Sequence, residues 1–443
     1  MLSLIGILVG LVVLIFLSYK GYPLVPVTII ASIIVILTGG IGLVTGIKDY
    51  FMDGFVTFTR NYYMLILSST LFAKLMGDSG AARAIADSCV KLVQKFPGKE
   101  KYMAVFAMLV VASVLSAGGI SAFVISFVMV PIGVSVFQAL NVPWHLFRCY
   151  SLGTGTYTLG GLPGMPAVNN IVPTSYLGTT ASAGPVLGVI ASIFMLVTGC
   201  IYIFYAVRKT IRKGEGFMET GHRIVERFGA KNTDELPQKI KFWQALIPPV
   251  AVLVLLNFVN LTSATAMFCG CGICYLLFHK NLPHVVRVSM GGSAKQAADV
   301  ICTTSCVVGF GSCVSAVPGF TYFVNALNAL NLSGPLQIVI IVAICCGLTG
   351  SSSGGLTITY NAFLEKFQSF GLDPQTIHRI SAIASNSLDS LPHSSAIVVG
   401  LEFCGLTHGE AYVHSGWLCT VIPMVASILV AVIAGPLNAM GIF

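Results

Sequence analysis

Apolar stretches recur along almost the whole chain and are separated by short polar segments. Several of them reach the roughly 20 residues that an α-helix needs to cross the hydrocarbon core of a bilayer. They lie near residues 2–17, 22–46, 62–77, 102–139, 148–162, 185–207, 242–258, 263–278, 298–317, 335–349, 356–370, 378–391 and 414–440. The pattern predicts an all-α polytopic membrane protein. Residues 2–17 resemble the apolar part of a signal peptide, but no basic region precedes them and no small-residue cleavage site follows before Lys20. We interpret them as the first span.

Composition supports a membrane protein, because 56% of the residues are hydrophobic, 9% are charged and the mean hydropathy is +0.88. A soluble domain carries roughly 25% charged residues. The chain has 13 cysteines, and those between 269 and 346 lie in apolar segments, where thiols pack as small hydrophobic groups. The cluster of Cys269, Cys271 and Cys274 has no second ligand pair at the spacing of a zinc site. The sequence therefore gives no reason to expect a metal or a cofactor.

The longest hydrophilic segment, residues 208–241, divides the chain into halves of 1–207 and 242–443. It holds nine lysines and arginines, which predicts a cytoplasmic location by the positive-inside bias. A basic segment can also contact anionic lipid or nucleic acid. Here acidic residues are interspersed, which favours a solvated linker and no nucleic-acid partner; they are Glu215, Glu219, Glu226, Asp234 and Glu235.

Two equivalent segments differ sharply in charge. Residues 78–101 carry five lysines and arginines opposite an apolar face at helical spacing, which predicts an amphipathic helix on the cytoplasmic surface. Residues 318–334 hold the same position in the second half and contain no charged residue. The two segments are therefore expected to face opposite compartments. This is what an inverted repeat with an odd number of crossings per half predicts, and about five per half, or about ten transmembrane helices, fit best.

Glycine and serine clusters interrupt one apolar block in each half. They occur at residues 116–119 within 102–139 and at residues 351–355 within 335–370. Unpaired backbone groups are tolerated at membrane depth only where protein or a water-filled cavity satisfies them. We therefore predict two re-entrant helical hairpins with these clusters at their tips. The charge pattern fixes only the parity of the crossings, so it leaves two full spans open as an alternative to each hairpin.

A second interrupted element follows each hairpin, at residues 148–170 and 378–394. Proline ends a helix and frees carbonyl groups, while Asn, Ser and Thr supply neutral ligands. At the tips, unpaired amides at a helix N-terminus favour an anion, although small residues also allow close helix packing. The candidate substrate-binding residues are Ser116, Gly118, Gly119, Pro163, Asn169, Asn170, Thr174, Ser352, Ser353, Gly354, Gly355, Asn386 and Ser394.

Ionisable residues at membrane depth are candidates for a coupling role. Asp389 and His393 stand four residues apart, and histidine can change charge in the physiological pH range. Alternatively, Asp389 braces the broken helix and His393 donates to a loop carbonyl. Arg148 and Arg379 each follow an X-Pro turn at the start of a span, so we expect them to anchor the chain at the membrane interface rather than to bind a carboxylate. No nucleophile elbow or zinc-protease motif indicates an enzyme.

The residues also carry a family resemblance over essentially the whole chain. The segments 116–132 and 161–174 resemble the ion transporter superfamily, and 77–86, 378–380 and 388–393 are similar to its gluconate permease (GntP) family. The resemblance implies proton-coupled symport of a small organic anion across the inner membrane. It also implies a homodimer with scaffold and transport domains and an elevator mechanism. Residues 169–176 look more like members that carry hydroxybutyrate or related short carboxylates than like sugar-acid members. A sodium-coupled carboxylate symporter and an anion channel remain as alternatives.

Overall fold

The computed structural model describes residues 2–93, 95–117, 122–165, 167–228, 237–259, 261–282, 289–329 and 331–441. These residues form helices and loops, and no β-strand occurs in these ranges. The first half contains α1 (Leu2–Tyr19), α2 (Leu24–Thr38), α3 (Leu43–Thr45), α4 (Met52–Asp78), α5 (Ala81–Val93), α6 (Glu100–Ala117), α7 (Ala122–Ala139), α8 (Val168–Leu177) and α9 (Pro185–Lys213). The segment between the halves contains α10 (Met218–Phe228). The second half contains α11 (Phe242–Asn257), α12 (Ser263–Phe278), α13 (Gly291–Ala316), α14 (Pro318–Asn328), α15 (Gly334–Thr349), α16 (Ser352–Gln368), α17 (Pro374–Ala384), α18 (Ser395–Phe403), α19 (His408–Gly416) and α20 (Ile422–Ala439).

Five helical segments in the described part of the chain are long and apolar enough to cross a membrane. They are Leu2–Tyr19, Glu100–Ala117, Pro185–Lys213, Gly291–Ala316 and the continuous stretch His408–Ala439. Shorter apolar helices cover Leu24–Thr38, Val124–Ala139, Phe242–Val252 and Gly334–Thr349. An all-helical membrane architecture is thus confirmed, whereas the number of about ten crossings stays a prediction.

Both predicted hairpin blocks consist of two helices that pack against each other. Residues 102–139 form α6 and α7, and residues 335–370 form α15 and α16. The interrupted elements are also present. Residues 148–170 pass from a 3-10 helix (Trp144–Gly153) through a π-helical turn (Tyr157–Gly161) to α8, and residues 378–394 pass from α17 through a short 3-10 turn (Leu388–Ser390) to α18.

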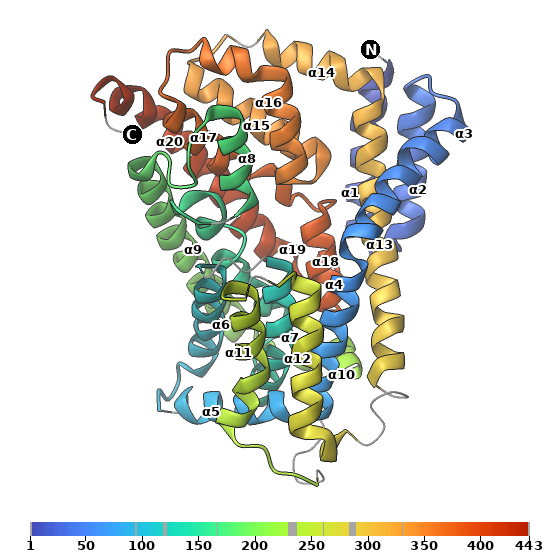
Figure 1. Cartoon of the computed structure of the whole chain (residues 1–443), viewed down its shortest axis with the longest axis vertical. Coiled ribbons are helices and arrows are strands. Elements are labelled where there is room, and N and C mark those ends of the chain that lie inside the picture. The colour runs from blue at the N-terminus through green and yellow to red at the C-terminus, as the bar shows by residue number, and fades with distance from the viewer. Residues whose placement is uncertain are drawn as a thin grey trace.

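Equivalent elements of the two halves lie toward opposite ends of the molecule. Figure 1 shows α5 near the lower end and α14 near the upper end of the long axis, with α6 and α7 in the lower part and α15 and α16 in the upper part. Contacts between helices also come in matched pairs. Helix α1 packs against α14 and α11 against α5; α2 packs against α13 and α12 against α4; α8 packs against α16 and α18 against α7. Within each pair, the second contact is obtained from the first when both helices are replaced by their counterparts in the other half.

The expectation of a solvated linker is wrong for part of residues 208–241. Helix α9 continues to Lys213, and α10 packs against α4, α7 and the 3-10 helix Trp144–Gly153. Ile224 is buried because α10 is strongly amphipathic and presents its apolar face to the bundle, and Phe217, directly before α10, is buried as well. Asp234 and Glu235 lie outside the described residues.

Candidate functional site

The two interrupted elements meet directly through buried polar side chains. Asn169 Nδ2 donates to Ser385 Oγ at 2.7 Å and to Asn386 Oδ1 at 2.6 Å. Asn386 Nδ2 donates in turn to the carbonyl oxygen of Thr156 at 3.1 Å. All four residues are buried. This network fixes the start of α8 against the end of α17, and it joins Asn169 and Asn386 from opposite halves of the sequence.

Arg379 ties the same junction together from inside the protein. It is fully buried on α17, where its Nε donates to the carbonyl of Ala183 at 2.9 Å. Its Nη1 donates to the carbonyl of Gly160 at 2.9 Å and to Asn170 Oδ1 at 2.7 Å. These acceptors lie in the first turn of α8 and in the segments on either side of that helix. The broken element leaves carbonyl groups without helical partners, and the guanidinium satisfies them with donors in a fixed fork.

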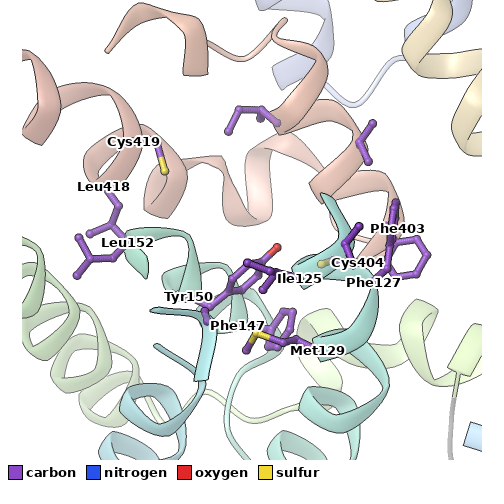
Figure 2. Close-up of a cluster of buried hydrophobic side chains, with 14 of the residues drawn as sticks. Ile125, Phe127, Met129, Phe147, Tyr150, Leu152, Phe403, Cys404, Leu418 and Cys419 are labelled. Carbon is purple, nitrogen blue, oxygen red and sulfur yellow. The ribbon is translucent and has the colours of Figure 1, made fainter. Parts of the chain in front are cut away.

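Arg148 is buried as well, but among hydroxyl groups. Its Nη1 donates to Tyr150 Oη at 3.1 Å, and its Nε and Nη2 donate to Ser415 Oγ at 3.3 and 3.2 Å. Figure 2 shows the neighbouring residues Phe147 and Tyr150 within an apolar cluster that also contains Ile125 and Met129. The prediction that Arg148 and Arg379 anchor the chain at the membrane interface is therefore wrong. Both side chains turn inward because neighbouring segments supply oxygen acceptors that the sequence does not reveal.

The tip of the second hairpin is a tight turn that exposes serine hydroxyls. Gly350 carries the chain from α15 to α16 with φ +60°, a left-handed conformation that favours glycine. Ser351 Oγ accepts the amide of Gly354 at 3.4 Å and lies 3.1 Å from Ser353 Oγ. Ser353 is exposed. The amides of Ser352 and Ser353 belong to the first turn of α16, where helix geometry provides no backbone acceptor, so this end favours an anion.

Asp389 lies at the point where the hairpin tip meets the broken element. Ser390 Oγ donates to its Oδ1 at 2.9 Å, and the Ser352 side chain lies close to the carboxylate. The carbonyl of Ser390 accepts hydrogen bonds from Tyr412 Oη at 3.1 Å and Thr420 Oγ1 at 3.2 Å, which hold the turn in place. Asp389 is partly exposed. The structure thus brings Asp389 to the first turn of α16.

His393 packs under the same tip. Its Nε2 lies 2.9 Å from the carbonyl of Gly347, so a neutral ring donates from Nε2. A Cβ at Gly350 would lie 3.3 Å from His393 Cδ2. The Nδ1 atom is buried without a hydrogen-bond partner among the described residues. No hydrogen bond joins His393 to Asp389 in that part of the chain, so the two coupling candidates share a junction but are not directly bonded.

The first hairpin makes a corresponding contact with its own broken element. Ser116 Oγ donates to Thr158 Oγ1 at 3.0 Å, and Thr158 Oγ1 donates to the carbonyl of Gly153 at 2.9 Å. Gly118 and Gly119 lie outside the described residues. Helix α6 therefore contacts the π-helical turn that follows it, as α15 contacts the 3-10 turn of the second half.

The remaining predicted residues have local roles. Ser394 Oγ accepts the amide of Ile397 at 3.3 Å and caps α18. Thr174 Oγ1 donates to the carbonyl of Ile171 at 2.6 Å, one turn earlier in α8. Pro163 is partly exposed in the loop before α8. Gly355 is buried where α15 and α16 approach each other, and a Cβ there would lie 2.5 Å from Cys346 Sγ.

Sequence reasoning missed several residues of the junction. Thr156, Thr158, Ser385 and Ser390 were not among the candidates, although each lies within a few residues of one. Their signal was available in the sequence, because hydroxyl residues concentrate in both broken elements. The contact of Arg379 with the loops around α8 had no such signal.

Comparisons with known proteins give a distant relationship. No protein-family model matches this chain. The uncharacterized transporter YxjC of Bacillus subtilis (strain 168) is 25% identical over 453 aligned positions, covering 93% of this chain and 94% of the relative. A solved structure, the YdaH transporter of Alcanivorax borkumensis, is 14% identical and covers 89% of each chain, with a TM-score of 0.41. The apolar helices and the relationship to YxjC indicate a multi-pass membrane protein.

Proposed function

We propose that the chain is a secondary active transporter that couples uptake of a small organic anion, a hydroxy acid or another carboxylate, to the entry of protons. The observation that carries this proposal is the junction at the second tip. There the Asp389 carboxylate and the Ser352 hydroxyl meet at the first turn of α16. The broad class is supported by the relationship to a protein described as a transporter over nearly its full length.

Two features support an inverted repeat. The contacts between helices come in pairs that exchange the halves, and α5 and α14 lie toward opposite ends of the molecule. We propose that each half forms one repeat, separated by the cytoplasmic segment 208–241. Membership of the GntP family, an inner-membrane location, a homodimer with scaffold and transport domains, and an elevator movement of the hairpins belong to the proposal on the strength of the sequence resemblance.

The chemistry of the tip provides a reason for coupling. A substrate carboxylate is favoured by the free amides and hydroxyl groups of Ser352 and Ser353. An ionised Asp389 beside them repels it, because like charges a few ångströms apart raise each other's energy. Protonation of Asp389 removes this repulsion. The anion and the proton therefore bind together, which is the linkage that a symporter requires.

A sodium-coupled mechanism is the second candidate, because the same junction is rich in oxygen ligands. Asp389, Ser352 and Ser390 supply one carboxylate and two hydroxyl groups, and Na⁺ prefers oxygen ligands as other hard cations do. Sodium neutralises the carboxylate as a proton does. An anion channel differs from both, because it equilibrates the substrate and cannot concentrate it.

Transport measurements in proteoliposomes distinguish these mechanisms. Hydroxy acids, dicarboxylates, tricarboxylates and sugar acids are offered under an imposed pH gradient or an imposed sodium gradient. Uphill uptake with the pH gradient alone supports the proposal, uphill uptake that follows only sodium favours the second candidate, and equilibration without accumulation contradicts both. Detergent-solubilised protein that turns over substrate without any gradient contradicts transport altogether.

Asp389→Asn tests the residue itself. The amide cannot release a proton, so we expect proton-driven accumulation to stop while substrate counterflow continues, since exchange does not require the empty carrier to return. Asp53→Asn is the matched control, because Asp53 is an exposed carboxylate in the first turn of α4. Uphill uptake by Asp389→Asn at the wild-type level would exclude Asp389 as the proton carrier.

A further inference from the structure

Helix α19 contacts the turn that separates the two coupling candidates of the second broken element. His408 Nε2 lies 2.7 Å from the carbonyl oxygen of Pro392, and the ring donates from Nε2 because a carbonyl can only accept. Tyr412 Oη donates to the carbonyl of Ser390 at 3.1 Å. Residues four apart lie on one face of a helix. One face of α19 therefore holds two carbonyl groups of this turn.

Both donors are buried and their rings are restricted by aromatic contacts. The ring of Tyr412 packs edge-on against the ring of Tyr19, with a distance of 5.7 Å between the centroids. The ring of His408 lies 6.3 Å from the same tyrosine. Water competes little for hydrogen bonds between buried groups, and the packed rings have few alternative positions. The two donors are therefore presented to the turn in fixed places.

The start of α19 is fixed by its sequence. Thr407 Oγ1 accepts the amide of Glu410 at 3.4 Å, and Glu410 Oε2 accepts the amide of Thr407 at 2.7 Å, which is a capping box. Arg223 of α10 forms an ion pair with the same glutamate. His408 is the first residue of the helix, so the cap also determines the direction in which its side chain leaves the backbone.

The last turn of α19 is attached to the first half of the chain. Ser415 Oγ accepts from Arg148 Nε at 3.3 Å and from its Nη2 at 3.2 Å. His414 Nε2 lies 2.8 Å from His145 Nδ1. Both partners belong to the 3-10 helix Trp144–Gly153, which packs against α19. The first half thus fixes the helix that holds the turn of the second half.

Ser390 connects α19 to the carboxylate of Asp389. Its carbonyl accepts from Tyr412 and, at 3.2 Å, from Thr420 Oγ1, while its own hydroxyl donates to Asp389 Oδ1 at 2.9 Å. A hydrogen bond donated to a carboxylate favours the ionised form. Release of the Ser390 carbonyl lets the hydroxyl leave its place beside the carboxylate, and the ionised form then loses stability relative to the protonated form.

We propose that His408 and Tyr412 are positioning residues of the coupling site, which fix the turn of the second broken element and thereby set the affinity of Asp389 for the coupling ion. They act through the backbone of that turn and through the Ser390 hydroxyl. The inference rests on the proposed function, because it gives both residues a part in coupling. It is separable from the identity of the ion, since a sodium ion bound at Asp389 depends on the same turn.

Uptake in proteoliposomes, measured against external pH, tests the role of Tyr412. The double variant Tyr412→Phe, Thr420→Val removes both donors to the Ser390 carbonyl and nearly keeps the shapes of the side chains. From the usual contribution of one hydrogen bond, we expect half-maximal uptake at a proton concentration about three- to tenfold lower than in the wild type. Each single variant leaves one donor, so the effect of the double variant should exceed the sum of the two. Tyr205→Phe, at an exposed position on α9, is the matched control.

Two substitutions of His408 separate its donor from its titration. Glutamine carries an N–H group near the place of Nε2 and does not titrate, whereas leucine has no donor. His408 lines a cavity of about 250 Å³, which gives either side chain room. We expect His408→Leu to shift the pH profile in the same direction as the double variant, and His408→Gln to restore the wild-type profile. His222→Leu, at an exposed position on α10, is the matched control.

Hydrogen exchange of residues 388–394 adds a measurement that does not require transport. The double variant and His408→Leu should exchange faster there and unchanged in α12. A wild-type pH profile in both variants would overturn the inference, and so would a His408→Gln variant that behaves like His408→Leu. If the double variant does not fold, the two His408 variants carry the test. Wild-type uptake that follows sodium and ignores pH contradicts proton coupling alone, and the double variant should then need about three- to tenfold more sodium.

Discussion

Arg379→Met removes the group that holds the first broken element. The guanidinium donates to the carbonyls of Gly160, Ala181 and Ala183 and to Asn170 Oδ1, at distances of 2.5 to 3.1 Å. Methionine keeps an unbranched stem that reaches about as far as Nε, and it has no donor. The three carbonyls and the amide oxygen then remain buried without these partners, and we expect the loops on both sides of α8 to loosen.

The loss of stability depends on how many hydrogen bonds are removed and on whether those bonds share an acceptor or a loop. A hydrogen bond to a charged group contributes about 1.5–3 kcal/mol, and a simple sum over the acceptors exceeds what single substitutions cost in practice. Several of these bonds share an acceptor or a loop, so their losses overlap. We expect a destabilisation of about 3–5 kcal/mol, the range for breaking a buried charged contact. Arg379→Lys should recover only part of it, because one ammonium cannot reach acceptors on both loops.

The assay is a temperature ramp in detergent, with the remaining monodisperse protein measured by size-exclusion chromatography. Unfolding of such a protein is usually irreversible, so variants are ranked under one protocol. Arg212→Met, an exposed position, is the control and should match the wild type. Arg148→Met should fall between them, because Arg148 has hydroxyl partners and leaves no row of carbonyls exposed. If Arg379→Met survives heating as well as Arg212→Met does, the hydrogen bonds of the Arg379 guanidinium do not stabilise the fold.

Two further predictions concern topology and the hairpin. Single cysteines at positions 91 and 326, both exposed, should react from opposite sides of the membrane, with an external impermeant reagent reaching 326 only; labelling of position 91 from outside would contradict the inverted repeat. Gly355→Ala should lower both thermal stability and transport, because its Cβ would lie 2.5 Å from Cys346 Sγ. Gly354→Ala should be tolerated, because the nearest atom would be 3.7 Å from its Cβ; equal effects of the two substitutions would show that close packing of α15 and α16 is not the reason.

The two helix pairs and the broken elements could be predicted because their signals are local, whereas the re-entrant course of each pair stays a prediction. Glycine, serine and proline inside an apolar block violate the usual pattern of a membrane helix, and the repetition of the pattern in both halves placed α6 with α7 and α15 with α16. Likewise, α5 was predicted from charges on one face of a short helix. In each of these cases the structure depends on residues within one turn or one hairpin of one another.

Contacts between distant segments could not be predicted in the same way. Arg379 and its acceptor at Gly160 are 219 residues apart, and the acceptor is a backbone carbonyl, which every residue has. A buried arginine paired with a carboxylate leaves a charge pattern in the sequence, whereas one paired with carbonyls leaves none. The packing of α10 was missed for a related reason, because its charged residues suggested solvent while Phe217 and Ile224 are buried.

The two broken elements satisfy their free backbone groups differently, and this difference bears on where ions bind. In the first half, Arg379 and the paired amides of Asn169 and Asn386 use the available oxygens inside the protein. In the second half, the hydrogen bond found for Asp389 among the described residues comes from the Ser390 hydroxyl, and His393 keeps a buried nitrogen without a partner in the same part of the chain. Buried polar groups are normally hydrogen-bonded. The second broken element therefore has more unused hydrogen-bonding capacity than the first, and this is why we propose the second tip, rather than the first, as the binding place of a coupling ion.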